Sequence, residues 1–254
     1  MTGYDILGNI VLVKFPRKMK KKDKVKFGEE FLKTRQQVKT VLEKSDKISG
    51  RLRTPETKFI CGEKTKEVVY RENGCVFRFN IDDCYFSPRL SSERSELAGI
   101  VKKGESVLVM FAGVAPFPIV IAKTKKPKRT VSVELNRACL QYAKDNVKEN
   151  KVNVEVVQAD VKRYALKTKE KFDRIVMARP NLKDSFLQSA FKLSKKGTII
   201  HYYGFYAEED KQQLLDMISD EAKKAKKKIK ISGIKKAGDI GVRKYRYRVD
   251  FKIL

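Results

Sequence analysis

Short apolar runs and longer amphipathic runs alternate along the second half of the chain. The strand-like runs, rich in β-branched residues, are 106–111, 130–134, 152–158, 172–178 and 196–203. The helix-like runs, in which apolar residues recur every three or four positions, are 116–125, 136–149, 183–194 and 207–227. This alternation predicts an α/β fold with a mostly parallel sheet and helices on both faces. The last segments, 228–234 and 244–253, predict an antiparallel hairpin at the sheet edge.

The first part of the chain has a different pattern. A strand-like run covers 9–15, and apolar residues at helical spacing from about Asp23 to Lys44 predict one amphipathic helix. Residues 47–80 then alternate strand-like runs with turn signals, and Asn73-Gly74 is typical of a hairpin turn. We therefore expect a small α+β domain with an antiparallel sheet, followed by a larger α/β domain, with bounds of 1–85 and 86–254.

The balance of charge indicates a polyanionic partner. The sequence holds 58 Lys and Arg against 31 Asp and Glu, a formal net charge of +27. Such a charge destabilises a compact chain unless a polyanion neutralises part of it, so a nucleic acid is the expected partner. The alternative, a Lys- and Glu-rich surface of a heat-adapted protein, predicts charges closer to balance.

Other sequence features argue for a cytoplasmic protein without a metal. No apolar run approaches the ~20 residues of a membrane span, and the N-terminus lacks the order of a signal peptide. The sole histidine, His201, is expected to be hydrogen-bonded and partly buried rather than catalytic. The four cysteines show no CxxC spacing, which predicts reduced thiols and no zinc site, although their even number also allows a disulfide: Cys61, Cys75, Cys84 and Cys139.

Residues 106–134 form the unit around which the larger domain is organised. A strand-like run enters the small-residue turn 112–115, and a helix-like run then leads to a second strand that ends at Glu134. Open α/β sheets hold nucleoside-containing cofactors in this way, with an acidic residue on the ribose. The turn lacks both GxGxxG and a P-loop Lys-Ser/Thr, which favours S-adenosylmethionine over NAD or ATP. Asp160 is expected near the adenine; alternatively, both carboxylates only cap strand ends.

Four motifs together resemble one enzyme family. They are DCYFSPRLSSER at 83–94, MFAGVAPF at 110–117, VELN at 133–136 and GTIIHYYGF at 197–205. The chain resembles the archaeal and eukaryotic-type tRNA (guanine-N1)-methyltransferases, which modify the guanine just 3′ of the anticodon. The resemblance implies a class I, Rossmann-like methyltransferase domain behind a small tRNA-binding domain, S-adenosylmethionine as methyl donor, tRNA as partner and a monomeric enzyme.

The resemblance also implies roles for individual residues. Arg94 matches the arginine that stabilises the guanine oxygen as N1 loses its proton, and Glu134 matches the acidic residue beside the cofactor ribose and the target base. The expected cofactor-binding residues are Tyr85, Phe86, Phe111, Ala112, Gly113, Val114, Glu134, Leu135, Asp160, Val161 and Ala178. The expected substrate-binding residues are Arg89, Arg179, Pro180, Asn181 and Tyr203; the last is either a surface for stacking on a base or a core residue.

Three positions depart from the family pattern. Val109 stands where an acidic residue usually precedes Met-Phe-Ala-Gly, and Ala115 replaces the second glycine of the turn. Ala178-Arg179-Pro180 replaces Asn-Leu-Pro, with Asn181 as a possible substitute for the amide. The chain also begins at what is usually the second domain, so a short form or a trimmed chain is expected.

These departures keep two alternatives open. The related wyosine-pathway enzyme transfers the aminocarboxypropyl group of the same cofactor to a modified guanine, and the acidic residue lost at Val109 bears on how the cofactor tail is turned. A catalytically silent RNA-binding relative is the second alternative, supported by Val109, Ala115 and Ala178. Methyl transfer is the favoured hypothesis.

Overall fold

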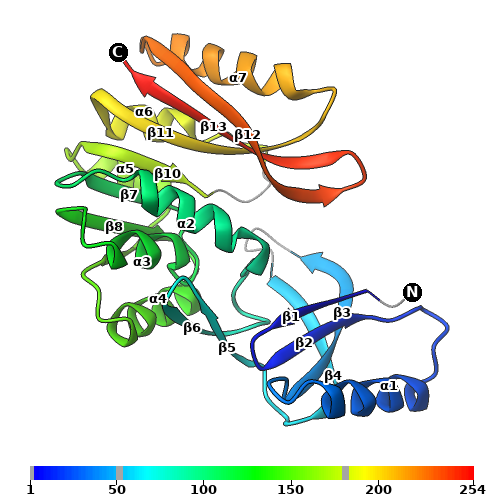
Figure 1. Ribbon diagram of the computed structural model, residues 1–254. Coiled ribbons are helices and arrows are strands. Elements are labelled where there is room, and N and C mark those ends of the chain that lie inside the picture. Colours follow the sequence, from blue (N-terminus) through cyan, green and yellow to red (C-terminus); the bar gives the residue numbers. More distant parts are fainter. Residues whose placement is uncertain (1–2, 50–53, 179–182) are drawn as a thin grey trace. The chain divides into compact units, whose positions relative to one another are not determined.

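The computed structural model describes residues 3–49, 54–178 and 183–254 (Figure 1). Contacts between residues group the chain into two compact units, Met1–Pro88 and Arg89–Leu254. Among the described residues, no helix is long and apolar enough to cross a membrane, and no three His, Cys, Asp or Glu residues cluster as metal ligands.

The first unit is built on a four-stranded sheet in the order β1-β2-β3-β4. β2 pairs antiparallel with β1 and parallel with β3, and β4 is antiparallel to β3, so this sheet is mixed. Helix α1 packs its apolar side chains, among them Phe27 and Phe31, against those of β2 and β3. The elements are β1 (Gly3–Leu7), β2 (Ile10–Lys14), α1 (Lys21–Thr34), β3 (Thr40–Ser49) and β4 (Thr54–Gly62).

A separate hairpin completes this unit. β5 (Glu67–Glu72) pairs antiparallel with β6 (Cys75–Asn80). Asn73 and Gly74 join the strands with φ values of 48° and 68°, as the type I′ hairpin turn requires. The hairpin expected from the Asn-Gly pair is therefore confirmed.

The expectation of one helix from Asp23 to Lys44 is wrong in its second half. The helix ends at Thr34, and β3 begins at Thr40. Val38 and Val41 continue the helical spacing of apolar residues, but they are buried because β3 pairs with β2, with Thr40 opposite Ile10. A short apolar run fits a helix or a strand equally well, and here the pairing with β2 decides for a strand.

The second unit contains a seven-stranded sheet in the order β12-β13-β11-β10-β7-β8-β9. β7, β8, β9, β10 and β11 run parallel, and β12 and β13 add an antiparallel hairpin beside β11. The expected parallel sheet with a terminal hairpin is confirmed. The strands are β7 (Ser106–Met110), β8 (Arg129–Glu134), β9 (Glu155–Gln158), β10 (Phe172–Met177), β11 (Ser194–Ala207), β12 (Ile229–Gly241) and β13 (Lys244–Ile253).

Helices cover both faces of this sheet, with α2, α3 and α4 on one face and α5, α6 and α7 on the other (Figure 1). A short 3₁₀ helix (Pro88–Leu90) leads into α2, and α5 was not expected from the sequence. The helices are α2 (Ser91–Ile100), α3 (Pro116–Lys123), α4 (Arg137–Glu149), α5 (Val161–Lys167), α6 (Leu187–Leu193) and α7 (Lys211–Lys224).

The two faces of the sheet differ in chemistry because successive strand residues point to opposite sides. We call the side toward α5, α6 and α7 the apolar face; it includes Leu108, Met110, Val131, Val133, Ile175, Met177, Ile200, Tyr202, Tyr247, Val249 and Phe251. We call the part of the other side that lies toward α2 the charged face; it consists of Arg174, His201, Tyr203, Lys235, Arg248 and Asp250.

Candidate active site

A strained turn follows β7 at the carboxyl edge of the sheet. Phe111, Gly113 and Ala115 have φ values of 61°, 56° and 64°, and the Ala115 N–H closes the turn on the Ala112 carbonyl at 2.9 Å. Left-handed backbone is costly for residues that carry a Cβ atom, and such strain concentrates at binding sites. Pro116 then begins α3, where its fixed φ suits the first helical turn. The turn is therefore a candidate ligand cradle.

The Glu134 carboxylate is fixed at the end of β8 by three backbone N–H groups. Its Oε2 accepts a hydrogen bond from the Gly113 N–H at 2.7 Å, and its Oε1 accepts from the Leu135 and Asn136 N–H groups at 2.8 Å each. Asn136 in turn caps α4 by accepting from the Ala138 N–H at 3.0 Å. One carboxylate thus joins the turn after β7 to the start of α4. A carboxylate has about four acceptor positions, so one is left for a ligand hydroxyl.

Further expected residues lie at the carboxyl ends of neighbouring strands. Asp160 follows β9 and caps α5, accepting a hydrogen bond from the Lys162 N–H at 2.8 Å. Leu135 is 38% exposed at the end of β8, and Ala178 directly follows β10. Because β10, β7, β8 and β9 are consecutive in the sheet, these residues share one edge with the turn. Ligands in open α/β sheets bind at this edge.

Arg94 lies on α2 beside the start of α3. Its side chain is only 1% exposed, and its guanidinium stands 5.7 Å from the centre of the Phe117 ring. Phe117 belongs to the first turn of α3, immediately after the strained turn. The ring face attracts a cation and covers it from water. The structure therefore brings a buried positive charge next to the segment that carries the candidate cradle.

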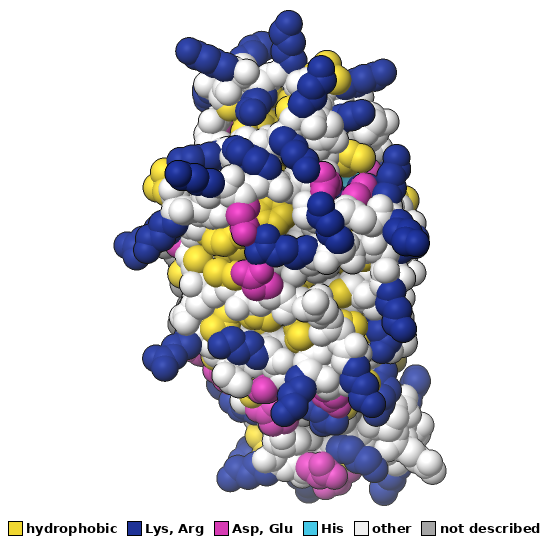
Figure 2. All heavy atoms as spheres, turned by 90° about the vertical axis from the view of Figure 1, so that its left-hand side faces the viewer, with side chains coloured by type: hydrophobic (Ala, Val, Ile, Leu, Met, Phe, Trp, Pro, Cys, Tyr) yellow, Lys and Arg dark blue, Asp and Glu magenta, His cyan; other side chains and the backbone are white. Residues whose placement is uncertain are grey.

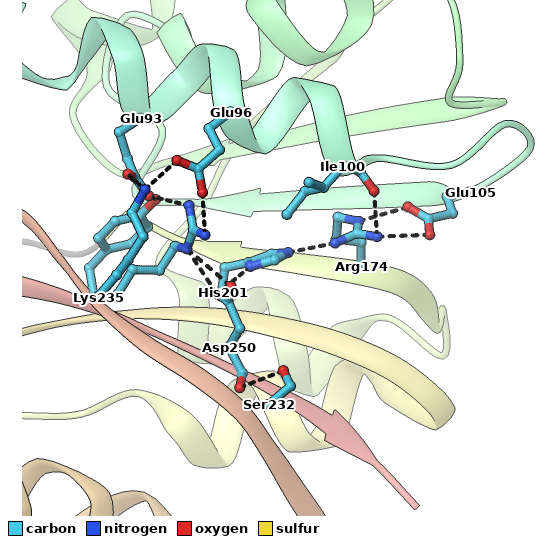
Figure 3. Close-up of polar contacts among 11 residues, drawn as sticks. Glu93, Glu96, Ile100, Glu105, Arg174, His201, Ser232, Lys235 and Asp250 are labelled. Atoms are coloured by element: carbon cyan, nitrogen blue, oxygen red, sulfur yellow. Dashed lines mark hydrogen bonds and ion pairs between the residues drawn. The ribbon is translucent and has the colours of Figure 1, made fainter.

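A network of buried polar residues, not anticipated from the sequence, lies between α2 and the charged face (Figure 3). Glu93, the neighbour of Arg94, accepts hydrogen bonds from the Tyr203 hydroxyl at 2.8 Å and from Arg248 Nη1 at 2.5 Å. Burial, together with the nearby Glu93 charge, raises the pKa of Tyr203 well above its ordinary value, so its hydroxyl stays protonated. The sequence does contain an indication of such a network, because charged residues interrupt apolar runs, as Arg174 does in FDRIVM.

His201 occupies the centre of this network. Its Nε2 lies 2.6 Å from Arg174 Nη1, and its Nδ1 lies 2.6 Å from Asp250 Oδ1. Arginine only donates, so Nε2 accepts and the ring proton sits on Nδ1, where it is donated to Asp250. Burial lowers the pKa of His201 below its ordinary 6.5, in agreement with a neutral ring. The expectation of a buried, hydrogen-bonded histidine is confirmed.

Comparison with known proteins identifies the family. A model of the TRM5/TYW2 methyltransferase domain matches residues 68–232, and a model of the TYW2 N-terminal domain matches residues 1–65. The chain belongs to the TRM5/TYW2 methyltransferase family. TRM5/TYW2 relatives include Taw22 of Nanoarchaeum equitans, named a tRNA (guanine(37)-N(1))/4-demethylwyosine(37)-methyltransferase, which is 36% identical over 99% of this chain and 100% of its own.

Trm5b of Pyrococcus abyssi, a tRNA (guanine(37)-N(1))-methyltransferase, is 35% identical over 99% of this chain and 75% of its own length. The crystal structure of Trm5b from this organism matches with a TM-score of 0.88 at 34% identity, covering 99% of this chain and 74% of that one. The crystal structure of Methanocaldococcus jannaschii Trm5 in complex with adenosine matches with a TM-score of 0.82 at 27% identity. The match covers 99% of this chain and 74% of that one. The TRM5/TYW2 fold thus extends over the whole chain.

The other residues expected from the TRM5/TYW2 motifs belong to other segments of the chain. Tyr85 and Phe86 belong to the first unit, where the Phe86 ring stacks on Phe79 at 5.0 Å while Tyr85 is 53% exposed. Arg89 lies in the 3₁₀ helix before α2. Arg179, Pro180 and Asn181 lie outside the described residues.

Tyr203 has a different setting from the one expected of a base-stacking residue. It is 1% exposed, its ring centre lies 5.9 Å from that of Phe117, and its hydroxyl donates to Glu93. Both ends of the side chain are therefore engaged inside the protein. In this TRM5/TYW2 chain, the Tyr203 hydroxyl is hydrogen-bonded to a residue of α2.

Val109 lies in the middle of the sheet. It is fully buried in β7, between Ser132 of β8 and Val176 of β10. A valine fits this enclosed site without an unpaired charge, whereas a carboxylate there would need hydrogen-bonding partners. The departure from the TRM5/TYW2 motif is therefore compatible with the packing of the sheet.

Proposed function

We propose that this protein transfers a methyl group from S-adenosylmethionine to N1 of the guanine at position 37 of tRNA, just 3′ of the anticodon. The observation that carries the proposal is the joint placement of Glu134 and Arg94. The Glu134 carboxylate is bound to the turn that begins α3, and the Arg94 guanidinium is packed on the first turn of the same helix. Identity of 35–36% to enzymes named for this reaction supports the assignment.

The residues at the carboxyl edge fit S-adenosylmethionine by their chemistry. Glu134 has an acceptor position left for a ribose hydroxyl, and the half-exposed side chain of Leu135 offers an apolar surface for the adenine. Only small side chains and one valine line the turn at Ala112, Gly113 and Val114, which leaves room for a bulky ligand. When bound, this cofactor supplies a methyl group on a positively charged sulfur.

Methylation of the guanine requires the protein to accept a proton from N1 and to stabilise negative charge on O6. N1 is a weak nucleophile until it loses its proton, and negative charge then develops on O6. In the proposed mechanism, Arg94 stabilises the charge on O6, and this interaction is strong because the guanidinium is buried. Glu134 remains the proposed acceptor of the N1 proton, although its three N–H partners also support a purely cofactor-binding role.

The surface charge supports tRNA as the partner. Figure 2 shows Lys and Arg side chains scattered over the whole visible face rather than gathered in one patch. With a net charge of +27, the protein attracts the phosphate backbone of RNA. We propose that it acts in the cytoplasm as a monomer, with the small domain 1–85 and the residues Arg89, Arg179, Pro180 and Asn181 contributing to RNA binding.

A second candidate substrate is 4-demethylwyosine at the same position of tRNA. It is favoured by the match to Taw22, which this chain covers over its whole length and whose name includes both substrates. The fold, the cofactor and Glu134 are compatible with either guanosine or 4-demethylwyosine as the substrate. Aminocarboxypropyl transfer is the third outcome, since a relative with that activity is 33% identical over 81% of this chain.

Mass spectrometry of nucleosides separates these outcomes. Unmodified tRNA and tRNA carrying 4-demethylwyosine are each incubated with the protein and S-adenosylmethionine, and the mass and position of the added group are measured. We expect 1-methylguanosine from unmodified tRNA. The proposal is overturned by an unmodified guanine 37 or by transfer of the aminocarboxypropyl group.

Two variants test the assigned roles. Arg94→Ala is expected to lower the rate of methyl transfer by at least about a hundredfold while cofactor affinity stays near the wild-type value. Arg94→Lys, which keeps the charge but loses the planar fork, is expected to retain part of the rate. An unchanged rate in Arg94→Ala contradicts the mechanism.

Glu134→Gln is expected to weaken cofactor binding about tenfold or more, because its amide NH₂ group would face a backbone N–H that now donates to the carboxylate. Calorimetry measures the affinity, and Glu209→Gln on the exposed surface is the matched control. Normal affinity in Glu134→Gln would remove this residue from the cofactor site.

A further inference from the structure

Helix α2, which carries Arg94, is held near both of its ends by buried polar side chains (Figure 3). Near its start, Glu93 and Glu96 reach toward β11, β12 and β13. At its last residue, the Ile100 carbonyl accepts a hydrogen bond from Arg174 Nη2 at 3.2 Å. The helix is thus tied to the strands at two points as well as packed against them.

The first attachment is centred on the Glu93 carboxylate, which is 5% exposed. Its Oε1 accepts from the Tyr203 hydroxyl at 2.8 Å and from Arg248 Nη1 at 2.5 Å, and its Oε2 lies 3.0 Å from Lys235 Nζ. Arg248 also reaches Glu96 Oε1 with Nη2, at 2.8 Å. The planar guanidinium of one arginine thus binds two carboxylates that lie one turn apart on the helix. Its geometry fixes both the distance and the orientation of the helix relative to Arg248.

The second attachment is joined to the first by a continuous chain of contacts. Arg248 donates to Asp250, Asp250 accepts from His201, and His201 accepts from Arg174. Arg174 then binds Glu105 through Nε at 2.7 Å and Nη2 at 3.0 Å, besides the Ile100 carbonyl. The chain of side chains therefore runs beneath the helix from its first turn to its end.

Such a network is a costly way to stabilise a helix. Desolvation offsets much of the attraction between buried charges, so apolar residues of similar volume give equal or greater stability. What charged hydrogen bonds add is a defined geometry, because donors and acceptors must meet at set distances and angles. The geometry fixed here is that of the first turn of α2, in which Glu93 immediately precedes Arg94.

A second path links Tyr203 to Arg94. The Phe117 ring contacts the Tyr203 ring, with centres 5.9 Å apart, and receives the Arg94 guanidinium on its face at 5.7 Å. Tyr203 therefore acts on Arg94 from two sides, through the backbone next to Glu93 and through the ring against which the guanidinium packs. Loss of the hydroxyl alone would leave the ring contact in place.

We propose that Glu93, Tyr203 and Arg248 are positioning residues that hold the first turn of α2 so that the Arg94 guanidinium meets the oxygen of the target base. This proposal rests on the role of Arg94 in the proposed function. The three residues need no contact with the cofactor or the base. They set the position of the charge that the reaction uses.

The test is a cycle of Tyr203→Phe and Arg94→Lys, measured by single-turnover methyl transfer, in which slow rates can be followed. Tyr203→Phe is expected to lower the rate constant about tenfold, the usual effect of losing one hydrogen bond to a charged group, with unchanged affinity for cofactor and tRNA. In the Arg94→Lys background the same change is expected to have little further effect, because the guanidinium it positions is gone.

Tyr247→Phe is the matched control. Tyr247 lies on the apolar face of β13, and its buried hydroxyl has no hydrogen-bond partner among the described residues. The Tyr247→Phe variant loses the same hydroxyl group as Tyr203→Phe, and its rate constant of methyl transfer is expected to stay at the wild-type value. Thermal unfolding of each variant shows that the assays are done on folded protein.

The outcomes separate the two hypotheses. If Arg94→Lys and Arg94→Ala leave the rate unchanged, the proposed function of Arg94 fails first. If those variants are impaired but Tyr203→Phe is normal, the positioning proposal is overturned and the role of Arg94 stands. Equal losses from Tyr203→Phe in both backgrounds also overturn it, since a general loosening of the fold would act independently of Arg94.

Discussion

The two faces of the seven-stranded sheet come from the same strands but have opposite chemistry. On β11, Ile200 and Tyr202 point to the apolar face, while His201 and Tyr203 point to the charged face. On β13, Val249 lies between Arg248 and Asp250 in the same way. Both sets are covered by helices, and Ile200, Tyr203 and Val249 are at most 1% exposed.

The difference between the faces reflects two requirements. The apolar face gains free energy from burial, which does not depend on direction, so its helices need only pack closely. The charged face holds α2 through hydrogen bonds that are satisfied in one arrangement. The first face supplies stability, and the second supplies the placement of one helix and of Arg94. Substitutions on the two faces should therefore separate stability from catalysis.

Arg248→Met is expected to have the largest effect, because it acts on both properties. Among the described residues, it leaves the buried Glu93 carboxylate with Lys235 and Tyr203 as partners, and losing the arginine from such a buried pair typically costs about 3–5 kcal/mol in the free energy of unfolding. The rate of methyl transfer by the protein that remains folded should also fall. Urea unfolding and single-turnover assays measure the two effects.

The control for Arg248→Met is Arg246→Met, two residues earlier on β13. Arg246 is partly exposed, with its guanidinium 5.2 Å from the Phe205 ring centre. We expect this variant to lose less than about 1 kcal/mol. If Arg248→Met were as mild as Arg246→Met, the buried network would not hold the helix.

Ile200→Ala is expected to lower stability without changing the chemistry. It removes a fully buried side chain from the apolar face and should cost about 2–4 kcal/mol through lost burial and the cavity left behind. The rate constant per folded molecule should match the wild type at temperatures well below unfolding. Ile240→Ala, at a position 42% exposed, is the control and should be nearly neutral. A reduced rate constant in Ile200→Ala would show that the two faces are not independent.

The sequence predicts the fold of the second unit well, because its strand-like and helix-like runs alternate regularly along the chain. The terminal hairpin was visible in the alternation of KYRYRVDFKI, which became β13. The first unit is harder to predict. The spacing of Val38 and Val41 suits a helix, and the strand that pairs with β3 is distant in sequence, so the pattern predicts a helix where β3 begins. Helix α5, at Val161–Lys167, is too short for its pattern to stand out.

The carboxyl edge was predictable for a different reason. Glu134 and the turn at 112–115 are close in sequence and follow strand-like runs, so a general rule about open sheets places them together. The charged face was not predictable, since alternation in β13 shows that its two sides differ but not what covers the polar one. In the structure, Arg248 of the polar side is hydrogen-bonded to Glu96 of α2.

The smallest predicted effect concerns pH and the neutral ring of His201. Burial is the main cause that lowers its pKa below 6.5; the charges of Arg174 and Arg248 lower it further, and Asp250 opposes them. Below pH 6.5, His201 therefore binds a proton in the unfolded chain but stays neutral in the folded protein. His201 accordingly makes stability fall with decreasing pH, by at most about 1.4 kcal/mol per pH unit, until the folded pKa is reached.

His201→Gln isolates this contribution. A glutamine amide can accept from Arg174 and donate to Asp250 as the neutral ring does, but it does not titrate. Between pH 7.5 and about 5.5, we expect the wild type to lose about 1 kcal/mol more unfolding free energy than the variant, because the other titrating groups are common to both. Equal losses, measured by urea unfolding at the two pH values, would mean that the ring is not held neutral, and the assignment of Nε2 as the acceptor from Arg174 would be wrong.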